Sequence, residues 1–132
     1  MKKALIITIS IIAILFVGGF IAYSQIEKRL ELLTQTEIED VDLENVPDGI
    51  YLGEYNSFPV SASVSVTVSN HEITEIVITR HDNGQGQAAE AIIDDVTSEQ
   101  TLLVDAIAGA TYSSKVILLA IHDALSGGGS SE

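Results

Sequence analysis

Apolar residues near the N-terminus form one long uninterrupted run. Ala4 to Tyr23 comprises 20 residues without a charge. Because a helix rises about 1.5 Å per residue, this run spans roughly 30 Å, the thickness of the hydrocarbon core of a bilayer. We therefore predict a transmembrane anchor over residues 1–24. A cleaved signal peptide is the alternative, since Ala22-Tyr23-Ser24 fits a cleavage site, but the apolar stretch of such peptides is usually only about 7–15 residues long.

A period of two follows further along the chain. Between Val60 and Ser69, valine or alanine alternates with serine or threonine at every position, which is typical of a half-buried antiparallel strand. Asn70-His71 then predicts a hairpin into a second strand over residues 72–80. The apolar phase shifts between Ile73 and Ile76, so we expect a β-bulge in that strand. Residues 50–55 predict an earlier strand.

Helical periods appear in the C-terminal half. Apolar residues at positions 89, 92, 93 and 96 predict an amphipathic helix that ends near Gln100. A short strand is expected at residues 102–104. A loop of small residues then leads to a last helix, capped by Ser113 or Ser114, that runs to Leu125. The predicted fold class is α+β: a small twisted antiparallel sheet packed with one or two helices, preceded by a single transmembrane helix.

Local composition divides the chain into four parts. Residues 1–24 are the anchor, and residues 25–47 form an acidic juxtamembrane linker. Ile26, Leu30 and Leu33 in this linker have helical spacing, and the acidic stretch after them has no core pattern. Val46-Pro47-Asp48-Gly49 is a turn signal that marks the start of the folded domain. The domain takes residues 48–126, about 80 residues, which is enough for a small core. Residues 127–132 are expected to be a flexible polar tail.

Charge restricts the partners of the exposed part. All 19 acidic residues lie after residue 24, against four basic residues there, so this part has a formal charge of −15. Such a surface argues against binding to nucleic acid and against adhesion to anionic lipid. Lys2, Lys3 and the amino terminus favour a cytoplasmic start, although Lys28 and Arg29 weaken the asymmetry. We expect a single-pass protein of the cell membrane with its domain on the extracytoplasmic side.

The chain contains no cysteine. This excludes a disulfide scaffold, a thiolate metal site, an iron–sulfur cluster and a haem attached through CxxCH. The three histidines are scattered and do not have the spacing of metal ligands, so no metal site is predicted. Any redox chemistry of this protein therefore points to an organic carrier or one held by other ligands.

The most informative stretch is a loop of small residues that ends in a hydroxyl, Thr111, just before the last helix. The free N–H groups and the positive end of the dipole at a helix N-terminus favour an anion there, most obviously a phosphate. Gly109 and Ala110 leave space around Thr111 for a bulky group. An ordinary loop followed by a capped helix is the alternative interpretation.

A second loop, residues 81–87, is polar and rich in glycine. Gly84-x-Gly86-x-x-Ala89 fits a dinucleotide-binding fingerprint. That fingerprint works inside a parallel βαβ sheet, which needs more units than about 80 residues can hold, and the strands before the loop look antiparallel. We interpret the loop as a turn that lets the backbone approach a ligand or a neighbouring segment. His81 is a candidate for contact with the edge of such a ligand, and a solvated loop is the alternative.

These features together resemble a known family. The run DAIAGATYSS at residues 105–114 is similar to the flavinylation motif of the FMN-binding domain family. That family includes the covalent-flavin subunits of sodium-pumping NADH:quinone reductase and of the related ferredoxin-oxidising membrane complex. The resemblance extends from DGIYLGEY at residues 48–55, through the hairpin and the Gly84-Gln85-Gly86 loop, to the final helix.

The resemblance implies a covalent cofactor. In this family a flavin transferase moves the FMN half of FAD onto the threonine of Gly-Ala-Thr, here Thr111, and Asp105 matches an aspartate that the transferase recognises. The family commonly has Ser or Thr where this chain has Ala108. The remaining cofactor-binding candidates belong to the motif, to the start of the last helix and to the glycine loop: Gly109, Ala110, Ser113, Ser114, Lys115, His81, Gly84 and Gly86. Tyr51, Tyr55 and Tyr112 are candidates for stacking on the flavin, with core packing as the default.

The predicted function is that of a membrane-anchored electron-transfer protein with FMN attached covalently to Thr111. Its partners would be a flavin transferase and redox partners in the membrane or outside it. We interpret the protein as a carrier rather than a stand-alone enzyme, with no catalytic residue assigned. Two alternatives stay open: a module that binds FMN or another phosphate ligand non-covalently, such as a sensor, and a cofactor-free interaction domain on a membrane anchor.

Overall fold

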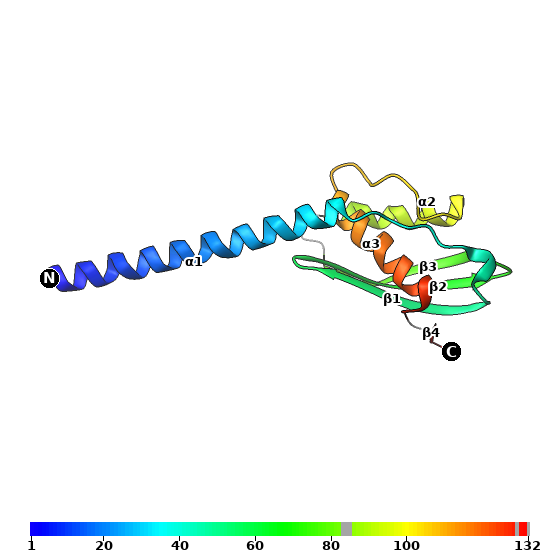
Figure 1. The fold of residues 1–132 in the computed structure, drawn as a ribbon, viewed down its shortest axis with the longest axis horizontal. Coiled ribbons are helices and arrows are strands. Elements are labelled where there is room, and N and C mark those ends of the chain that lie inside the picture. The colour runs from blue at the N-terminus through cyan, green and yellow to red at the C-terminus, as the bar shows by residue number, and fades with distance from the viewer. Residues whose placement is uncertain (83–85, 129, 132) are drawn as a thin grey trace.

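One long helix leads into a small domain that contains one sheet and, within the described residues, five shorter helical segments (Figure 1). The computed structural model describes residues 1–82, 86–128 and 130–131. Helix α1 (Lys2–Gln35) projects away from the domain, and the remaining elements form two layers, helices on one side and strands on the other. The α+β class and the apolar N-terminal helix predicted from the sequence are confirmed.

The sheet is antiparallel, with the strand order β3-β2-β1-β4. Its strands are β1 (Gly49–Ser57), β2 (Val60–Ser69), β3 (Glu72–Asp82) and the two-residue β4 (Ser130–Ser131). In β2 every second side chain is buried, as the alternation predicted. The pairing of β2 with β3 shifts register twice, at Ser63/Val64 and Thr67/Val68, so the expected irregularity in the second strand of the hairpin is confirmed. β4 pairs with Ile50 and Tyr51 of β1, so part of the segment expected to be a free tail joins the sheet edge.

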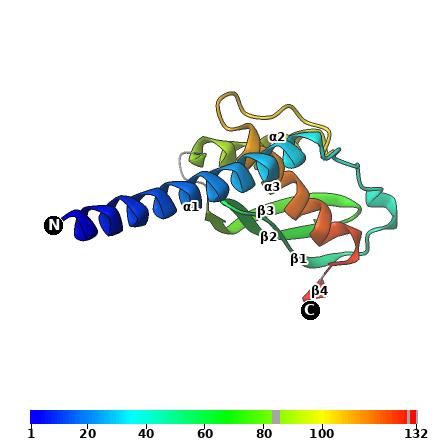
Figure 2. The ribbon, with the colours of Figure 1, turned by 60° about the vertical axis from the view of Figure 1, so that its left-hand side comes forward.

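The helices cover one face of the sheet (Figure 2). Helix α3 (Thr111–Asp123), which continues into the π-helical turn η3 (Ala124–Gly128), packs on β1 and β2. Gly53 allows this close approach, because a Cβ there would overlap the carbonyl oxygen of Ala120 and the backbone of Ala124. The 3₁₀ turn η2 (Gln87–Ala91) lies beside α3, and helix α2 (Ile92–Glu99) packs on β3. Together they bury Ala89, Ile92 and Val96.

Helix α1 has two environments along its length. Its N-terminal part is apolar and exposed, and within the described residues it is the one helix long and apolar enough to cross a membrane. Its last turns lie against the domain, where Leu33 is only 2% exposed and Leu30 packs against the core. The following segment, including the 3₁₀ turn η1 (Leu43–Asn45), adds the buried Val46 to the core. Residues 25–47 were expected to form an acidic juxtamembrane linker, but most of their apolar side chains pack on the domain.

Two local predictions were wrong. Residues 102–104 were expected to form a strand but are irregular, because the N–H of Leu102 donates to the Asp40 carboxylate and that of Leu103 to the Thr101 hydroxyl. These side chains take the place of a neighbouring strand. Helix α3 begins at Thr111, with Ala110 in the N-cap position, so neither Ser113 nor Ser114 caps it.

Candidate functional site

The N-terminus of α3 is held in place by Ser114 rather than capped by a side chain. Ser114 is fully buried, and its Oγ donates to the carbonyl oxygen of Ala110 (2.8 Å) and accepts from the N–H of Ile107 (3.0 Å). The hydroxyl therefore joins the first turn of the helix to the loop before it. Since no side chain caps the helix, the N–H groups of its first turn remain directed outward, which is the arrangement that binds anions.

A glycine turn brings the loop to the start of the helix. Gly109 has φ +79°, a left-handed conformation that a residue with a Cβ rarely adopts, and the space where its Cβ would lie is open. The N–H of Ala110 donates to the carbonyl oxygen of Ile107 (3.0 Å) and closes the turn. Thr111 then begins the helix with its side chain exposed. The glycine thus has a conformational role as well as leaving space.

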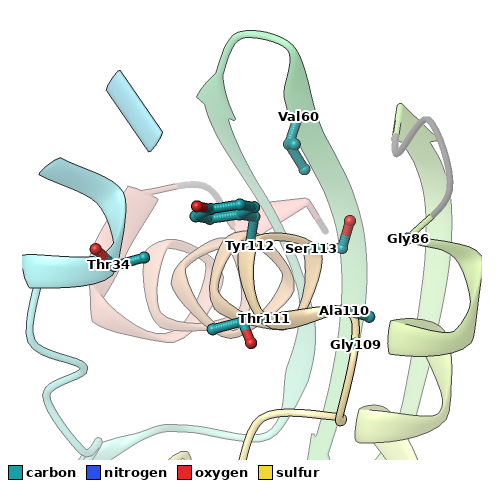
Figure 3. A pocket seen from close by; sticks show the side chains of 8 residues that line it. All are labelled: Thr34, Val60, Gly86, Gly109, Ala110, Thr111, Tyr112 and Ser113. Atoms are coloured by element: carbon teal, nitrogen blue, oxygen red, sulfur yellow. The ribbon is translucent and has the colours of Figure 1, made fainter. Parts of the chain in front are cut away.

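Thr111 stands at the edge of a cavity of about 530 Å³. Four segments that are distant in sequence line it: the end of α1, the start of β2, the start of η2, and the loop and first turn of α3 (Figure 3). The eight described lining residues, all uncharged, are Thr34, Val60, Gly86, Gly109, Ala110, Thr111, Tyr112 and Ser113. The cavity is thus mostly apolar, with a few hydroxyls and one helix N-terminus.

These residues fit a phosphorylated flavin. The volume lies within the range of about 300–1,000 Å³ that is usual for pockets of cofactor-sized ligands. Tyr112, which is 41% exposed, offers an aromatic ring to a planar group. Gly86, Gly109 and Ala110 leave room where larger side chains would intrude, and the first turn of α3 offers N–H groups to a phosphate. FMN is a planar ring system joined to a phosphate, so both ends find matching surfaces.

The structure brings together five of the predicted site residues and places others elsewhere. Gly86, Gly109, Ala110, Thr111 and Ser113 line the cavity. Asp105 is exposed on the preceding loop. The Lys115 ammonium group donates to the carbonyl oxygen of Thr34 (2.8 Å), so it is directed to the end of α1 rather than to the anion position that had been considered for it.

Two further candidates, His81 and Tyr51, contact other groups of the protein. His81 lies at the end of β3, with its side chain 2% exposed and its Nδ1 3.0 Å from Oε1 of Glu90. Its side chain is thus buried at the end of a strand rather than exposed in a solvated loop. Gly84 lies outside the described residues. Of the three tyrosines considered for stacking, Tyr112 lines the cavity, whereas the Tyr51 hydroxyl donates to the carbonyl oxygen of Pro47.

Two lining residues, Thr34 and Val60, were missed by the sequence analysis. Val60 is the first residue of an alternating strand, so its burial was predicted but its place in a site was not. Thr34 lies 77 positions before Thr111, in a segment interpreted as a linker. The helical spacing of Leu30 and Leu33 was the one signal that this segment packs, and it does not say against what.

Two carboxylates near these elements have lowered pKa values. Partial burial of Asp40 tends to raise its pKa, but hydrogen bonds from Thr101, Leu102 and Val41 outweigh that effect and lower it. The pKa of Asp82, at the end of β3, is lowered by hydrogen bonds from Ser61 and Arg80. Within the described residues, no group of three or more His, Asp or Glu side chains could hold a metal ion.

A mostly apolar cavity with a helix N-terminus at its edge is the arrangement expected of a domain that binds a phosphate-bearing cofactor. The chain is a member of the FMN-binding domain family, whose profile matches residues 59–126. The matched segment includes β2, β3, η2, α2 and α3, and therefore every lining residue of the cavity except Thr34. Family membership supports FMN as the cofactor of this cavity.

The chain is also similar to one characterised enzyme. Over 118 residues it is 32% identical to the NADH:acrylate oxidoreductase of Vibrio harveyi, a match that covers 83% of this chain and 12% of the relative. The chain thus spans only a small part of that protein. No solved structure matches the chain.

Proposed function

We propose that this protein is a membrane-anchored electron carrier with FMN attached to Thr111 by a phosphoester, and with its domain on the extracytoplasmic side. The observation that carries the proposal is the position of Thr111: an exposed hydroxyl at the first residue of α3, on the wall of a cavity of flavin size. The similarity to an NADH-dependent oxidoreductase supports electron transfer.

Attachment needs a hydroxyl that an external transferase can reach. Thr111 Oγ would form the new bond to the flavin-side phosphorus of FAD while the P–O–P bond breaks, AMP leaves and the hydroxyl proton passes to solvent. The exposure of Thr111, Ala108 and Asp105 leaves this side of the domain open to such an enzyme. The phosphoester keeps one negative charge, which the dipole and N–H groups of α3 stabilise, typically by about 0.3–1 kcal/mol at an exposed site.

Once bound, FMN accepts and donates one or two electrons. The residues of the chain hold and shield it. Val60 and Tyr112 supply apolar surface that excludes water from part of the cavity, while Gly109 and Ala110 let the ligand approach the backbone.

The membrane placement rests on α1. Its apolar part is exposed over its whole length, which is costly in water and favourable in lipid. Lys2 and Lys3 before the apolar run favour a cytoplasmic N-terminus, so the domain would face the other side.

The test is the intact mass and visible absorbance of the full chain after co-expression with an active flavin transferase, followed by denaturation. We expect a yellow protein that is heavier by one FMN and stays yellow when unfolded. Thr111→Ala should remove the added mass, whereas Thr74→Ala, which changes an exposed threonine on β3, should keep it.

An unmodified mass, obtained while the same transferase modifies a known substrate, would overturn the covalent attachment. Flavin that copurifies but is lost on denaturation would then support non-covalent binding. Since Ala108 replaces the usual hydroxyl residue, Ala108→Thr is the variant that should increase the modified fraction if that hydroxyl assists the transfer.

A further inference from the structure

The last turns of α1 form one wall of the cofactor cavity. Thr34 lines the cavity, and its neighbour Leu33 is buried in the domain core at 2% exposure. Leu32, the residue before Leu33, is 65% exposed. The helix that carries the apolar span is therefore also a packed element of the domain.

Lys115 joins the two helical walls of the cavity. It lies on α3 one turn after Thr111, and its Nζ donates to the carbonyl oxygen of Thr34 at 2.8 Å. That carbonyl belongs to the last turn of α1, where the negative end of the helix dipole favours a cation. One side chain thus connects the C-terminus of the anchor helix to the N-terminal part of the helix that bears the attachment residue.

The segment after α1 is pinned as well. The Asp40 carboxylate accepts hydrogen bonds from Thr101 Oγ1 (2.6 Å) and from the N–H of Leu102 (3.0 Å). Further along, Asp48 accepts from the N–H of Asn70 (2.8 Å). Hydrogen bonds therefore hold the segment between the anchor helix and the sheet to the domain, so it is not a flexible linker.

No helix breaker separates the span from the cavity. Residues 24–35 contain neither glycine nor proline, and α1 is continuous through them. Thr34 lies eleven positions after Tyr23, the last residue of the apolar run. At about 1.5 Å per residue this separation places the cavity wall at most roughly 17 Å beyond the hydrocarbon boundary, and less if the helix is tilted.

We propose that the C-terminal turns of α1 are a positioning element, which holds the cofactor cavity at a fixed, short height above the bilayer so that its redox partner is a protein embedded in the same membrane. Leu33 seats the helix, Lys115 secures its end, and Thr34 completes the cavity. The alternative is a domain that swings on its anchor toward soluble partners. This inference rests on the proposed membrane span and gives the proposed carrier its class of partner.

Pulsed electron paramagnetic resonance can test the seating without any cofactor. The chain lacks cysteine, so nitroxides attach only at Glu27→Cys, exposed on α1, and Ser98→Cys, exposed on α2. In lipid nanodiscs the full chain should give one narrow distribution of label–label distances. Lys115→Met should broaden the distribution, whereas Lys28→Met, the same change at an exposed position of α1, should leave it unchanged. Leu33→Ala should broaden it further, and Leu32→Ala should not.

A broad distribution for the unsubstituted chain would overturn the proposal, as would equal widths for Lys115→Met and Lys28→Met. Because these measurements use protein that has not met a transferase, they succeed or fail independently of flavin attachment. Far-ultraviolet circular dichroism of each variant separates loss of seating from loss of folding.

The height of the cavity above the bilayer can be measured by resonance energy transfer. The donor is a dye attached through Ala108→Cys beside the cavity, and the acceptors are labelled lipid headgroups. A four-residue alanine insertion after Gln25 adds about one turn, or roughly 6 Å. For a seated helix this insertion should lower the transfer efficiency clearly. An efficiency that the insertion does not change would mean that the domain moves freely on its anchor and would reject the fixed height.

Discussion

The two helical walls of the cavity differ in origin. The wall formed by the turn and the start of α3, from Gly109 to Ser113, is contiguous in sequence and made of small or hydroxyl-bearing residues. The opposite wall is the end of α1, where Thr34 is present only because Leu33 and Lys115 hold that helix against the domain. The first wall contains the chemistry of attachment, and the second determines where that chemistry stands relative to the membrane. The residues for cofactor attachment and the residues that position the cavity therefore lie on different walls of the same cavity.

The largest effect is expected from a substitution that removes the attachment hydroxyl of the first wall and leaves the second wall unchanged. Thr111→Val keeps the shape of the side chain but lacks the hydroxyl, so covalent flavin should fall to nothing by intact mass. Because the side chain is exposed at the start of α3, the free energy of unfolding should change by no more than about 0.5 kcal/mol. Thr111→Ser should retain some modification. Flavin still covalently bound in Thr111→Val would show that the attachment residue is another one.

The next effect concerns the second wall. Leu33→Ala removes a buried side chain and should lower the free energy of unfolding by about 2–5 kcal/mol. Leu32→Ala, one position away and exposed, should change it by about 0.5 kcal/mol at most. Thermal unfolding of the full chain in detergent compares the two. Equal stabilities would mean that α1 does not pack on the domain as described.

A smaller effect tests the seat of α3 on the sheet. Gly53→Ala introduces a Cβ that meets the Ala120 carbonyl oxygen, so α3 must move, at a cost of about 1–3 kcal/mol in unfolding free energy. Gly49→Ala, whose Cβ would meet only the Tyr51 ring at 3.6 Å or more, is the matched control. Urea denaturation of both variants measures the difference, which should be absent if α3 does not lie directly on β1.

The smallest effect is a pH dependence at Asp40. Its folded-state pKa is lowered, so its contribution to stability is present above the pKa of the unfolded chain, about 3.9, and is lost as the pH falls through the folded-state value. Asp40→Asn should therefore be slightly less stable than the unsubstituted chain near pH 7 and equally stable near pH 2. Because water screens this partly exposed group, the difference should stay below about 1 kcal/mol. Glu39→Gln should show no such pH-dependent loss of stability. If it did, the effect would come from the overall charge of the domain and not from the hydrogen bonds of Asp40.

Regular periods made much of the fold predictable. The alternation of β2 gave its boundaries and buried face, because a strand places successive side chains on opposite faces whatever its neighbours are. The phase shift after Ile73 indicated the irregular pairing of β3 for the same reason. The helix cap was not predictable in this way. Ser113 and Ser114 both have the right side chain for a cap, and only the burial of Ser114 between Ile107 and Ala110 decided otherwise.

The candidate site shows the same difference between local patterns, which the sequence reveals, and contacts that depend on tertiary packing. Gly109, Ala110, Thr111 and Ser113 were candidates because the small-residue loop before the last helix resembles the flavinylation motif of the family, and that motif consists of adjacent residues. The role expected of Lys115 was not supported, since its ammonium group lies 2.8 Å from a carbonyl oxygen on α1 that is 81 positions away in sequence. Hydrogen bonds between residues so far apart in sequence depend on how the helices pack. The periodicity of the sequence does not indicate which residue will be the hydrogen-bond partner.

By itself the sequence determined the apolar span, the antiparallel hairpin and the small-residue loop before Thr111, because each is a pattern of residues close to one another along the chain. It also pointed to the family, because motifs along the whole domain resemble it. Only the tertiary structure decided that the expected linker is a packed continuation of the anchor, that Thr34 and Val60 complete the cavity, and that Lys115 joins its two walls. Those contacts arise when the apolar side of α1, marked by Leu30 and Leu33, is buried against α3 and the core. Burial selects its partner by shape in three dimensions, and the order of residues along the chain does not specify that partner.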